Sequence, residues 1–397
     1  MKFTLPKNVL IQIPFLFTLS GFVQLSILNG LHWQYVIAMT VWSLCFIGTY
    51  YGLRQTIPHI NPFLLPIVSL LTGLGFLMVA RLAPNFLIQQ VIWLIFSIGI
   101  LLIITLAPKN LNWLQKYKYI YFSGGLLLLS ATYVVGVNPS GFGAKLWLRI
   151  GGLFFQPSEL LKILFVMFMA AYFSDSSLKM SRPLWSIIPV VLMWGIAMLL
   201  LFWQPDLGTA LLFFFTFLAI LYVATGELVY LLAGVILLIM AGGIGAFTFD
   251  YVAQRLQGWW NPWTDPTGKY FQIIQSLLAF ANGGWFGQGL GQGLPTAVPV
   301  VHTDFVFAAI GEEYGLLGTL GILFCYWLIV CQAFNITRRS HDKFHKYLAI
   351  GIGTIFAFQV LIITGGVLKL LPMTGITLPF ISYGGSSLVT SYSMIWQ

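Results

Sequence analysis

Asp304 has the sequence position that best suits catalysis. The chain has ten acidic residues among 397, and this one lies where a long polar segment, 249–305, gives way to an apolar run. A carboxyl group close to hydrocarbon can have its pKa raised toward neutral pH, which suits a general base that takes a proton from a hydroxyl group. The alternative, left open by the sequence, is that Asp304 only caps the helix that follows it.

Two charged side chains lie within an apolar run, where charge is costly and usually functional. Glu159 and Lys162 are three residues apart, so they share one face of a helix. They either neutralise each other and join two helices, or border a cavity and orient a polar ligand. Asp206 follows Pro205 at the start of another apolar run, where an aspartate complements the helix dipole.

Other titratable residues flank Asp304 in the sequence. His302 lies two positions earlier, and in an extended segment the two side chains would point the same way, so the imidazole could tune the carboxylate. A solvated loop histidine is the alternative. Glu312 and Glu313 lie two turns into the following helix and need a partner if they are buried. No HExxH or GxSxG motif and no metal-spaced cluster occurs, so a hydrolase has no support and any metal site stays undetermined.

The composition indicates a chain whose main solvent is lipid. Hydrophobic residues make up 59% of it and charged residues 7%, against about 25% charged residues in soluble domains. In lipid, only helices and closed barrels satisfy the backbone, and long apolar runs without alternation favour helices. The net charge of +9 is spread over short loops, which indicates membrane orientation and not nucleic-acid binding.

The sequence predicts an all-α integral membrane protein, a polytopic bundle of about twelve spanning helices. The expected spans are 9–29, 32–53, 62–80, 86–107, 119–137, 157–173, 184–203, 207–224, 228–248, 305–334, 347–368 and 382–397. With the N-terminus inside, twelve of the 19 Lys and Arg residues lie in inner loops and six in outer loops. This orientation places the 249–305 segment and Asp304 on the extracytoplasmic side, together with the cations Lys145, Arg149 and Arg255.

The 249–305 segment contains two recognisable parts. Residues 270–280 have apolar side chains at helical spacing but are too few to span, so we expect a helix along the membrane interface. The glycine-rich run, residues 283–293, either cradles a phosphate with its backbone amides or crosses the membrane surface irregularly. It lacks the Gly-Lys-Ser/Thr ending of a P-loop.

Five segments in this order resemble the SEDS family, which includes RodA, FtsW and SpoVE. They are WLRIGGLFFQPSELLK (147–162), WQPDLGTAL (203–211), QIIQSLLAFANGGWFGQGLGQG (272–293), VVHTDFVFAAIGEEYGLLG (300–318) and LPMTGITLPFISYGGSS (371–387). The resemblance implies a ten-helix core over 61–397, preceded by two additional helices within 1–60, as in longer RodA-like members. The chain departs from a common family pattern where Ile363 replaces an asparagine and Lys369 replaces a glycine.

The resemblance implies a peptidoglycan glycosyltransferase that polymerises lipid II at the outer face of the bacterial plasma membrane, in elongation or division, releasing undecaprenyl pyrophosphate. Asp304, in HTDF, is then the candidate catalytic residue. The residues expected at the substrate are Lys145, Arg149, Glu159, Lys162, Asp206, Arg255, His302, Glu312 and Ser386. Cations among them, or a divalent ion such as Mg²⁺ or Mn²⁺, would neutralise the leaving pyrophosphate.

Expected partners are lipid II, a class B penicillin-binding protein and membrane lipids, with no nucleic acid. Two other functions are kept as alternatives. A lipid II transporter would also use polar residues within spans, but it needs them at mid-membrane and on both sides. A scaffold that only anchors a transpeptidase has no need of a lone acid beneath a long loop.

Overall fold

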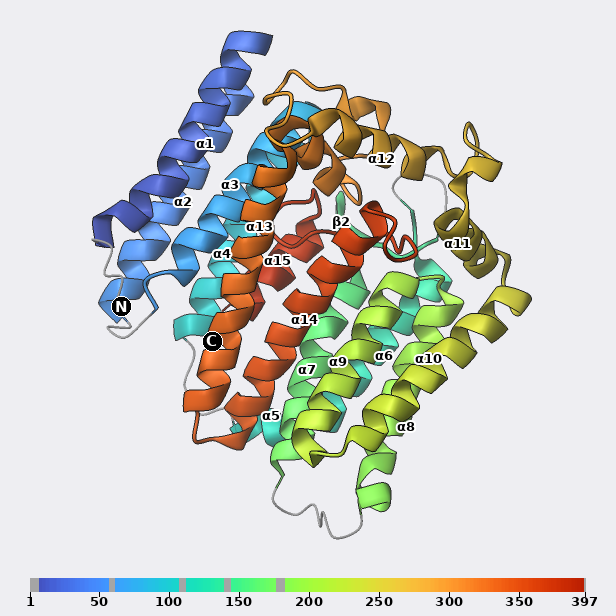
Figure 1. Cartoon of the computed structure of the whole chain (residues 1–397). Helices are drawn as coiled ribbons and strands as arrows, with labels where there is room; N and C mark the ends of the chain where they lie inside the picture. The colour runs from blue at the N-terminus through green and yellow to red at the C-terminus, as the bar shows by residue number, and fades with distance from the viewer. Residues whose placement is uncertain (1–6, 57–60, 107–111, 139–143, 176–182, 396–397) are drawn as a thin grey trace.

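The computed structural model describes the whole chain except residues 1–6, 57–60, 107–111, 139–143, 176–182 and 396–397. Within the described residues, eleven helices are long and apolar enough to cross a membrane. They are α1 (Lys7–Asn29), α2 (Trp33–Thr56), α3 (Leu64–Leu82), α4 (Leu87–Leu106), α6 (Lys118–Val135), α7 (Pro157–Ser174), α8 (Pro183–Trp203), α9 (Leu207–Thr225), α10 (Leu228–Thr248), α13 (Val306–Arg339) and α14 (Lys343–Val367). Figure 1 shows them as one bundle.

The expected twelfth span is shorter than predicted. The first residues of the predicted span, 382–384, are not helical. The helix α15 covers only Gly385–Met394. Ten residues of helix are about 15 Å long, half the thickness of the hydrocarbon layer. Most of α15 is buried, and it packs against α4 and α7. The last two residues of the predicted span, 396–397, lie outside the described residues.

The segment 249–305 is mostly folded and not an open loop. It contains α11 (Asp250–Trp260) and α12 (Phe271–Gly283), with the one-turn 3₁₀ helices η2 (Pro262–Thr264) and η3 (Pro295–Ala297). The helix expected over 270–280 is confirmed as α12, although its place at a membrane interface stays a prediction. The α11 helix was not expected. Both lie together at one end of the bundle (Figure 1), called here the α12 end.

Small elements complete the description. The segment before α7 forms a two-stranded antiparallel hairpin of β1 (Leu148–Ile150) and β2 (Leu153–Phe155), an exception to the all-helical prediction. The short helix α5 (Asn112–Lys116) and the 3₁₀ turn η1 (Pro84–Phe86) connect spanning helices. All three lie in connections between helices, so they leave the bundle architecture unchanged.

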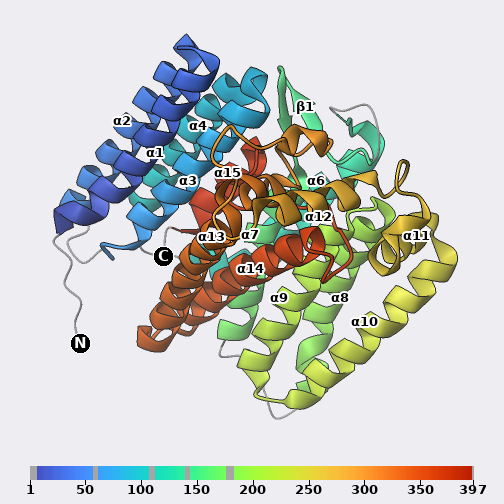
Figure 2. The same ribbon diagram turned by 45° about the horizontal axis from the view of Figure 1, so that its top comes forward.

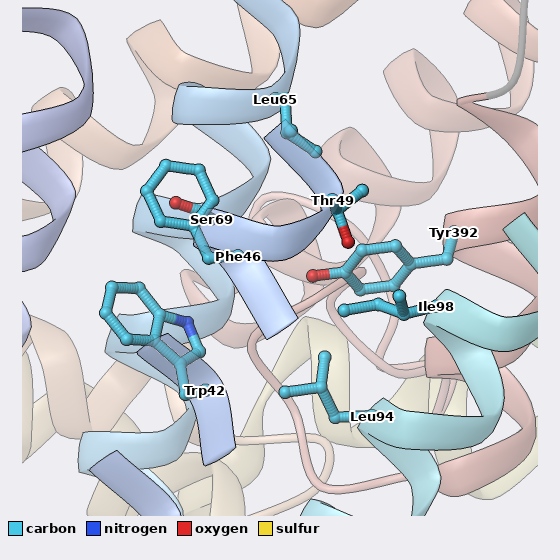
Figure 3. A pocket seen from close by; sticks show the side chains of 8 residues that line it. All are labelled: Trp42, Phe46, Thr49, Leu65, Ser69, Leu94, Ile98 and Tyr392. Carbon is cyan, nitrogen blue, oxygen red and sulfur yellow. The ribbon is translucent and has the colours of Figure 1, made fainter. Parts of the chain in front are cut away.

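The two N-terminal helices share a core with the rest of the bundle. The views in Figures 1 and 2 both place α1 and α2 beside α3. Figure 3 shows the pocket where α2 meets α3, α4 and α15: Trp42 and Phe46 of α2 line it together with Leu94 and Tyr392. The hydroxyl group of Tyr392 is within 2.9 Å of Thr72 Oγ1 on α3. α2 and α15 therefore meet around apolar side chains from four helices.

Candidate active site

Asp304 lies in a turn, immediately before α13, and does not cap that helix. The N-cap position is Phe305, and no side chain makes a capping hydrogen bond there. The capping alternative is therefore wrong. The carboxylate instead faces the segment that follows α14: a Cβ atom built on Gly375 would lie 3.3 Å from Asp304 Oδ2. Gly375 has φ +77°, so a residue without Cβ is suited to this close approach.

Arg255 of α11 reaches the same segment. Its Nη1 donates to the carbonyl oxygen of Met373 at 2.8 Å, and its Nη2 lies 3.9 Å from the Cβ position of Gly375. Burial lowers the pKa of Arg255, whereas the charges of Asp206 and Asp304 raise it. The guanidinium group thus interacts with both carboxylates, one at the start of α9 and one at the start of α13.

Burial raises the pKa of Asp304 to about 6. A hydrogen bond from the Thr303 side chain and the charge of Arg255 lower this pKa, and the charge of Asp206 raises it, but the burial effect is the largest. At neutral pH the carboxylate is mostly ionised and yet more basic than an exposed aspartate. That combination is what a general base requires.

Asp206 lies at the start of α9, as the sequence predicts, and its side chain caps that helix. Its Oδ1 accepts from the backbone N–H of Thr209 at 3.2 Å, and its Oδ2 accepts from the Ser158 hydroxyl at 3.1 Å. Burial raises the pKa of Asp206, these two hydrogen bonds lower it, and the charge of Glu159 raises it. The cap therefore also joins α9 to the first turn of α7.

The pair on α7 forms a buried ion pair. Lys162 Nζ lies 2.7 Å from Glu159 Oε2, and the two residues are 2% and 5% exposed. Thr390 of α15 donates to the same Glu159 oxygen at 2.9 Å, and Lys162 donates to Gln359 Oε1 of α14 at 3.4 Å. These contacts support the first alternative, in which the pair joins helices. A role in orienting a ligand stays a prediction.

The segment 371–387 connects this polar network to Asp304. Gln359 donates to the carbonyl oxygen of Thr377 at 2.7 Å, and the Thr377 hydroxyl donates to Ser387 Oγ at 2.7 Å. Ser382 donates to the carbonyl oxygen of Thr303 at 2.6 Å. Ser386 accepts from the backbone N–H of Gln156 at 3.0 Å, which joins α15 to the start of α7.

His302 does not tune the carboxylate of Asp304, so that prediction is wrong. Residues 299–305 form turns and not an extended strand, so alternate side chains do not share a direction. The imidazole stacks on Phe86, with ring centroids 5.5 Å apart, and lies 5.8 Å from the ring of Tyr383. Burial lowers its pKa, which favours a neutral ring in an aromatic contact.

Two of the predicted cations are not brought to Asp304. Lys145 and Arg149 are exposed, Arg149 on the β1 strand. Neither contributes to the pKa shift of Asp304, and neither makes a hydrogen bond or ion pair to another residue in the described ranges. Their role toward substrate stays a prediction. The cation next to the acid is Arg255.

The side chains of Glu312 and Glu313 find their partners in the residue that follows the glycine-rich run and in α3. Glu312 Oε1 accepts from the backbone N–H of Leu294 at 3.0 Å, and Glu313 Oε1 lies 3.1 Å from Nε of Arg81. The N–H groups of Gln288 and Gly289 donate to the carbonyl oxygens of the two glutamates, both at 2.9 Å. Since these amides are occupied, they cannot cradle a phosphate. A substrate role for Glu312 stays a prediction.

Sequence reasoning missed several residues of the site. Gly375, Thr377 and Ser382 all lie in the segment LPMTGITLPFISYGGSS, of which only Ser386 was expected at the substrate. The signal that could have found Gly375 is a threonine-glycine pair between two prolines, which is typical of a turn. Gln359 keeps the family pattern from which Ile363 departs, but its contacts with α7 and with residue 377 gave no local signal.

Comparison with known proteins decides the family. The model of the cell cycle protein family FtsW/RodA/SpoVE matches residues 63–396. The chain belongs to this family. The FtsW/RodA/SpoVE match begins at α3, so α1 and α2 precede it. With eleven long apolar helices among its described residues, this member of the family is a membrane protein.

Named relatives within the family cover most of the chain. A protein of Mycobacterium leprae named peptidoglycan glycosyltransferase RodA is 35% identical over 376 residues, which is 89% of this chain and 80% of the relative. A probable peptidoglycan glycosyltransferase FtsW of Geobacter metallireducens is 37% identical over 279 residues, 70% of this chain and 74% of the relative.

Two solved structures have a similar fold. The rod shape determining protein RodA of Thermus thermophilus matches with a TM-score of 0.65 and 25% identity over 86% of this chain and 96% of that one. A chain from a peptidoglycan synthase complex, described as coordinating polymerization and crosslinking, matches with a TM-score of 0.73 and 28% identity over 85% and 96%.

Proposed function

We propose that this chain is a peptidoglycan glycosyltransferase that polymerises lipid II, with Asp304 as its general base. The observation that carries the proposal is the carboxyl group of Asp304, whose pKa is raised to about 6 beside the guanidinium group of Arg255. Support comes also from the relatives of this family member, which are named peptidoglycan glycosyltransferases.

The reaction joins two lipid-linked sugars. The 4-hydroxyl oxygen of one sugar forms a bond to C1 of the other, and the bond from C1 to the pyrophosphate oxygen breaks. Asp304 takes the hydroxyl proton, and undecaprenyl pyrophosphate leaves with the electron pair. A direct displacement of this kind needs one base and forms no covalent sugar intermediate.

Arg255 is the residue best placed to stabilise negative charge on the leaving pyrophosphate. Stabilisation of developing charge is often the largest catalytic contribution. Its hydrogen bond to the carbonyl oxygen of Met373 holds the guanidinium group against the segment that Asp304 faces. The buried network around Asp206 and Glu159 holds the ends of α7, α9 and α15 together, next to Asp304 and Arg255.

A divalent cation stays a prediction. Asp206 and Asp304 are the carboxylates that could hold Mg²⁺ or Mn²⁺, which commonly takes one or two carboxylates and completes its ligands with substrate phosphates and water. In the described part of the chain, no three His, Cys, Asp or Glu side chains come together as a ready metal site. When bound, such an ion would supply further positive charge at the pyrophosphate.

The surroundings of the reaction are also part of the proposal. The α12 end would face outward from the bacterial plasma membrane, with lipid II entering from the outer leaflet. The similarity to a chain of a peptidoglycan synthase complex supports a crosslinking partner, which we take to be a class B penicillin-binding protein. The charge distribution of the loops supports this orientation.

Transport of lipid II is the alternative function. At the end of the bundle opposite to α12, Asp175 pairs with Lys118 at 2.7 Å, and Asp342 pairs with His345. The buried charges of α7 are likewise paired with each other. Asp304 with its raised pKa lies beside Arg255 at the α12 end alone, which favours chemistry at one face over passage between two.

The experiment is polymerisation of labelled lipid II by the purified protein, with and without a class B penicillin-binding protein. We expect glycan strands and released undecaprenyl pyrophosphate. Reconstitution in vesicles separates the alternatives: movement of labelled lipid II between leaflets without any glycan product would overturn the polymerase in favour of the transporter.

A further inference from the structure

We propose that α1 is a positioning element that holds the segment carrying Asp304 in place. The proposal rests on the proposed function, since it gives α1 a role toward the catalytic base. α1 precedes the residues matched by the family model, so nothing in that match assigns it a task. Its contacts reach from α3 to the glycine-rich run and from there to α13.

α1 is packed closely against α3 along its length. A Cβ atom on Gly21 of α1 would lie 2.5 Å from Cδ1 of Leu77, and one on Gly73 of α3 would lie 2.1 Å from Oγ1 of Thr18. Two glycines thus let the helices approach at two levels. Leu25 of α1 is fully buried. The helix is therefore held on the bundle and can transmit a constraint.

The last turns of α1 contact the glycine-rich run directly. Gln24 Nε2 donates to the carbonyl oxygen of Leu290 at 2.9 Å. Cδ1 of Leu28 lies only 2.6 Å from the Cβ position of Gly291, a residue with φ +80°. One hydrogen bond and one close approach of a leucine side chain thus connect α1 to two adjacent residues of the run.

The run in turn is bonded to α13. Besides the bonds from Gln288 and Gly289 to the glutamate carbonyls, the N–H of Leu316 donates to the carbonyl oxygen of Gly284 at 2.9 Å. A Cβ atom on Gly287 would lie 2.2 Å from the carbonyl oxygen of Glu313. Here the backbones touch, so a shift of the run must shift the first turns of α13.

Asp304 depends on this attachment because it lies two residues before α13 begins. The chain enters α13 without a side-chain cap. The turn that carries Asp304 is tied elsewhere by the bond from Tyr383 N–H to the carbonyl oxygen of His302 at 2.9 Å, and by Ser382. These bonds require that α13 start at the right place relative to 371–387. Through Gln24 and Leu28, α1 contributes to that placement.

The test combines hydrogen exchange with turnover in two variants and a control. Gln24→Glu keeps the side-chain size but removes the donor, and Leu28→Ala removes the apolar contact. Ile27→Ala is the matched control, because Ile27 lies on the same turn and is 78% exposed. Exchange is followed at the amides of Gln288 and Gly289, which report on the run, and at Tyr383, which reports on the turn that carries Asp304.

We expect both variants to exchange about fivefold faster at all three amides, a change of the size that the loss of one typical hydrogen bond produces. Turnover should fall by a similar factor with KM unchanged, and Ile27→Ala should match the wild type. Faster exchange at Gln288 and Gly289 alone, with Tyr383 exchange and turnover unchanged, would overturn the proposal, as would unchanged exchange throughout. Hydrogen exchange is measured without substrate. If the protein failed to polymerise lipid II, the proposed function would be refuted, and the exchange rates would still show whether α1 holds the turn that carries Asp304.

Discussion

At the scale of single residues, the account depends on three charges that act on one another at the α12 end. Asp304, Arg255 and Asp206 come from three different elements. The pKa of Asp304 is lowered by Arg255 and raised by Asp206. Burial is the largest cause of the raised pKa of Asp304, so neither charged neighbour alone makes this residue basic. Each neighbour should still change the pKa of Asp304 in the direction that the sign of its own charge sets.

We predict that substitutions of Arg255 and Asp206 shift the pH dependence of polymerisation in opposite directions. Asp304 must be ionised to accept a proton, so the polymerisation rate is full above its pKa and falls as the pH drops through about 6. Arg255→Met removes a charge that lowers the pKa, so the acid limb of the pH–rate profile should move to higher pH. Asp206→Asn removes a charge that raises it, so the limb should move to lower pH. Shifts in one common direction would contradict the assignment.

The ion pair on α7 makes a separate prediction at this scale. Glu159→Gln or Lys162→Met should each leave the partner charge buried and unpaired, at a cost of roughly 3–5 kcal/mol of unfolding free energy. The double variant should lose much less than the sum. Thermal unfolding in detergent compares the wild type, the two single variants and the double variant. Glu227→Gln is the control, because Glu227 is exposed. Additive losses would show that the two charges do not stabilise each other.

At the scale of elements, the sequence predicts most spans because a crossing helix requires about 20 apolar residues. Length could not reveal that α15 covers only Gly385–Met394, since no charged residue interrupts the predicted span 382–397. The helix α11 was missed because Asp250–Trp260 mixes polar and aromatic residues. The place of Asp206 at a helix start and the contact between Glu159 and Lys162 were predictable because they are local. The contact between Arg255 and Met373 was not, since 118 residues separate the partners.

Gly375 allows an element-scale prediction about the segment after α14. An alanine here would adopt φ +77° and place its Cβ 3.3 Å from Asp304 Oδ2. The left-handed conformation costs about 1–2 kcal/mol in a residue with a side chain. We expect Gly375→Ala to reduce turnover by at least tenfold while the protein still folds.

The control for Gly375→Ala is Gly243→Ala in α10. A Cβ there meets no neighbouring atom, and alanine is the better helix former by about 1 kcal/mol. Turnover and thermal unfolding should both be near those of the wild type in this control. Equal turnover in the two variants would show that the close approach of residue 375 to the carboxylate has no part in the reaction.

At the scale of the whole molecule, the proposed reaction requires the α12 end to face outward. Cysteine at Thr296, an exposed residue of η3, should react with a membrane-impermeant maleimide in intact spheroplasts. Cysteine at His341, an exposed residue between α13 and α14, should react only after lysis. The background replaces the native residues Cys45, Cys325 and Cys331. A reversed pattern would contradict both the orientation and an extracytoplasmic reaction.

The most direct measurement is the polymerisation rate of Asp304→Asn from pH 5 to pH 8, beside wild type and Asp265→Asn. The asparagine keeps the shape of the side chain and cannot take a proton. Asp265 is a control because its carboxylate lies in an exposed turn, accepting from the backbone N–H of Lys269. The account predicts that Asp304→Asn folds but loses at least about 10²-fold in rate, while the other two proteins show an acid limb near pH 6. A folded Asp304→Asn protein that polymerised lipid II at the wild-type rate would contradict it.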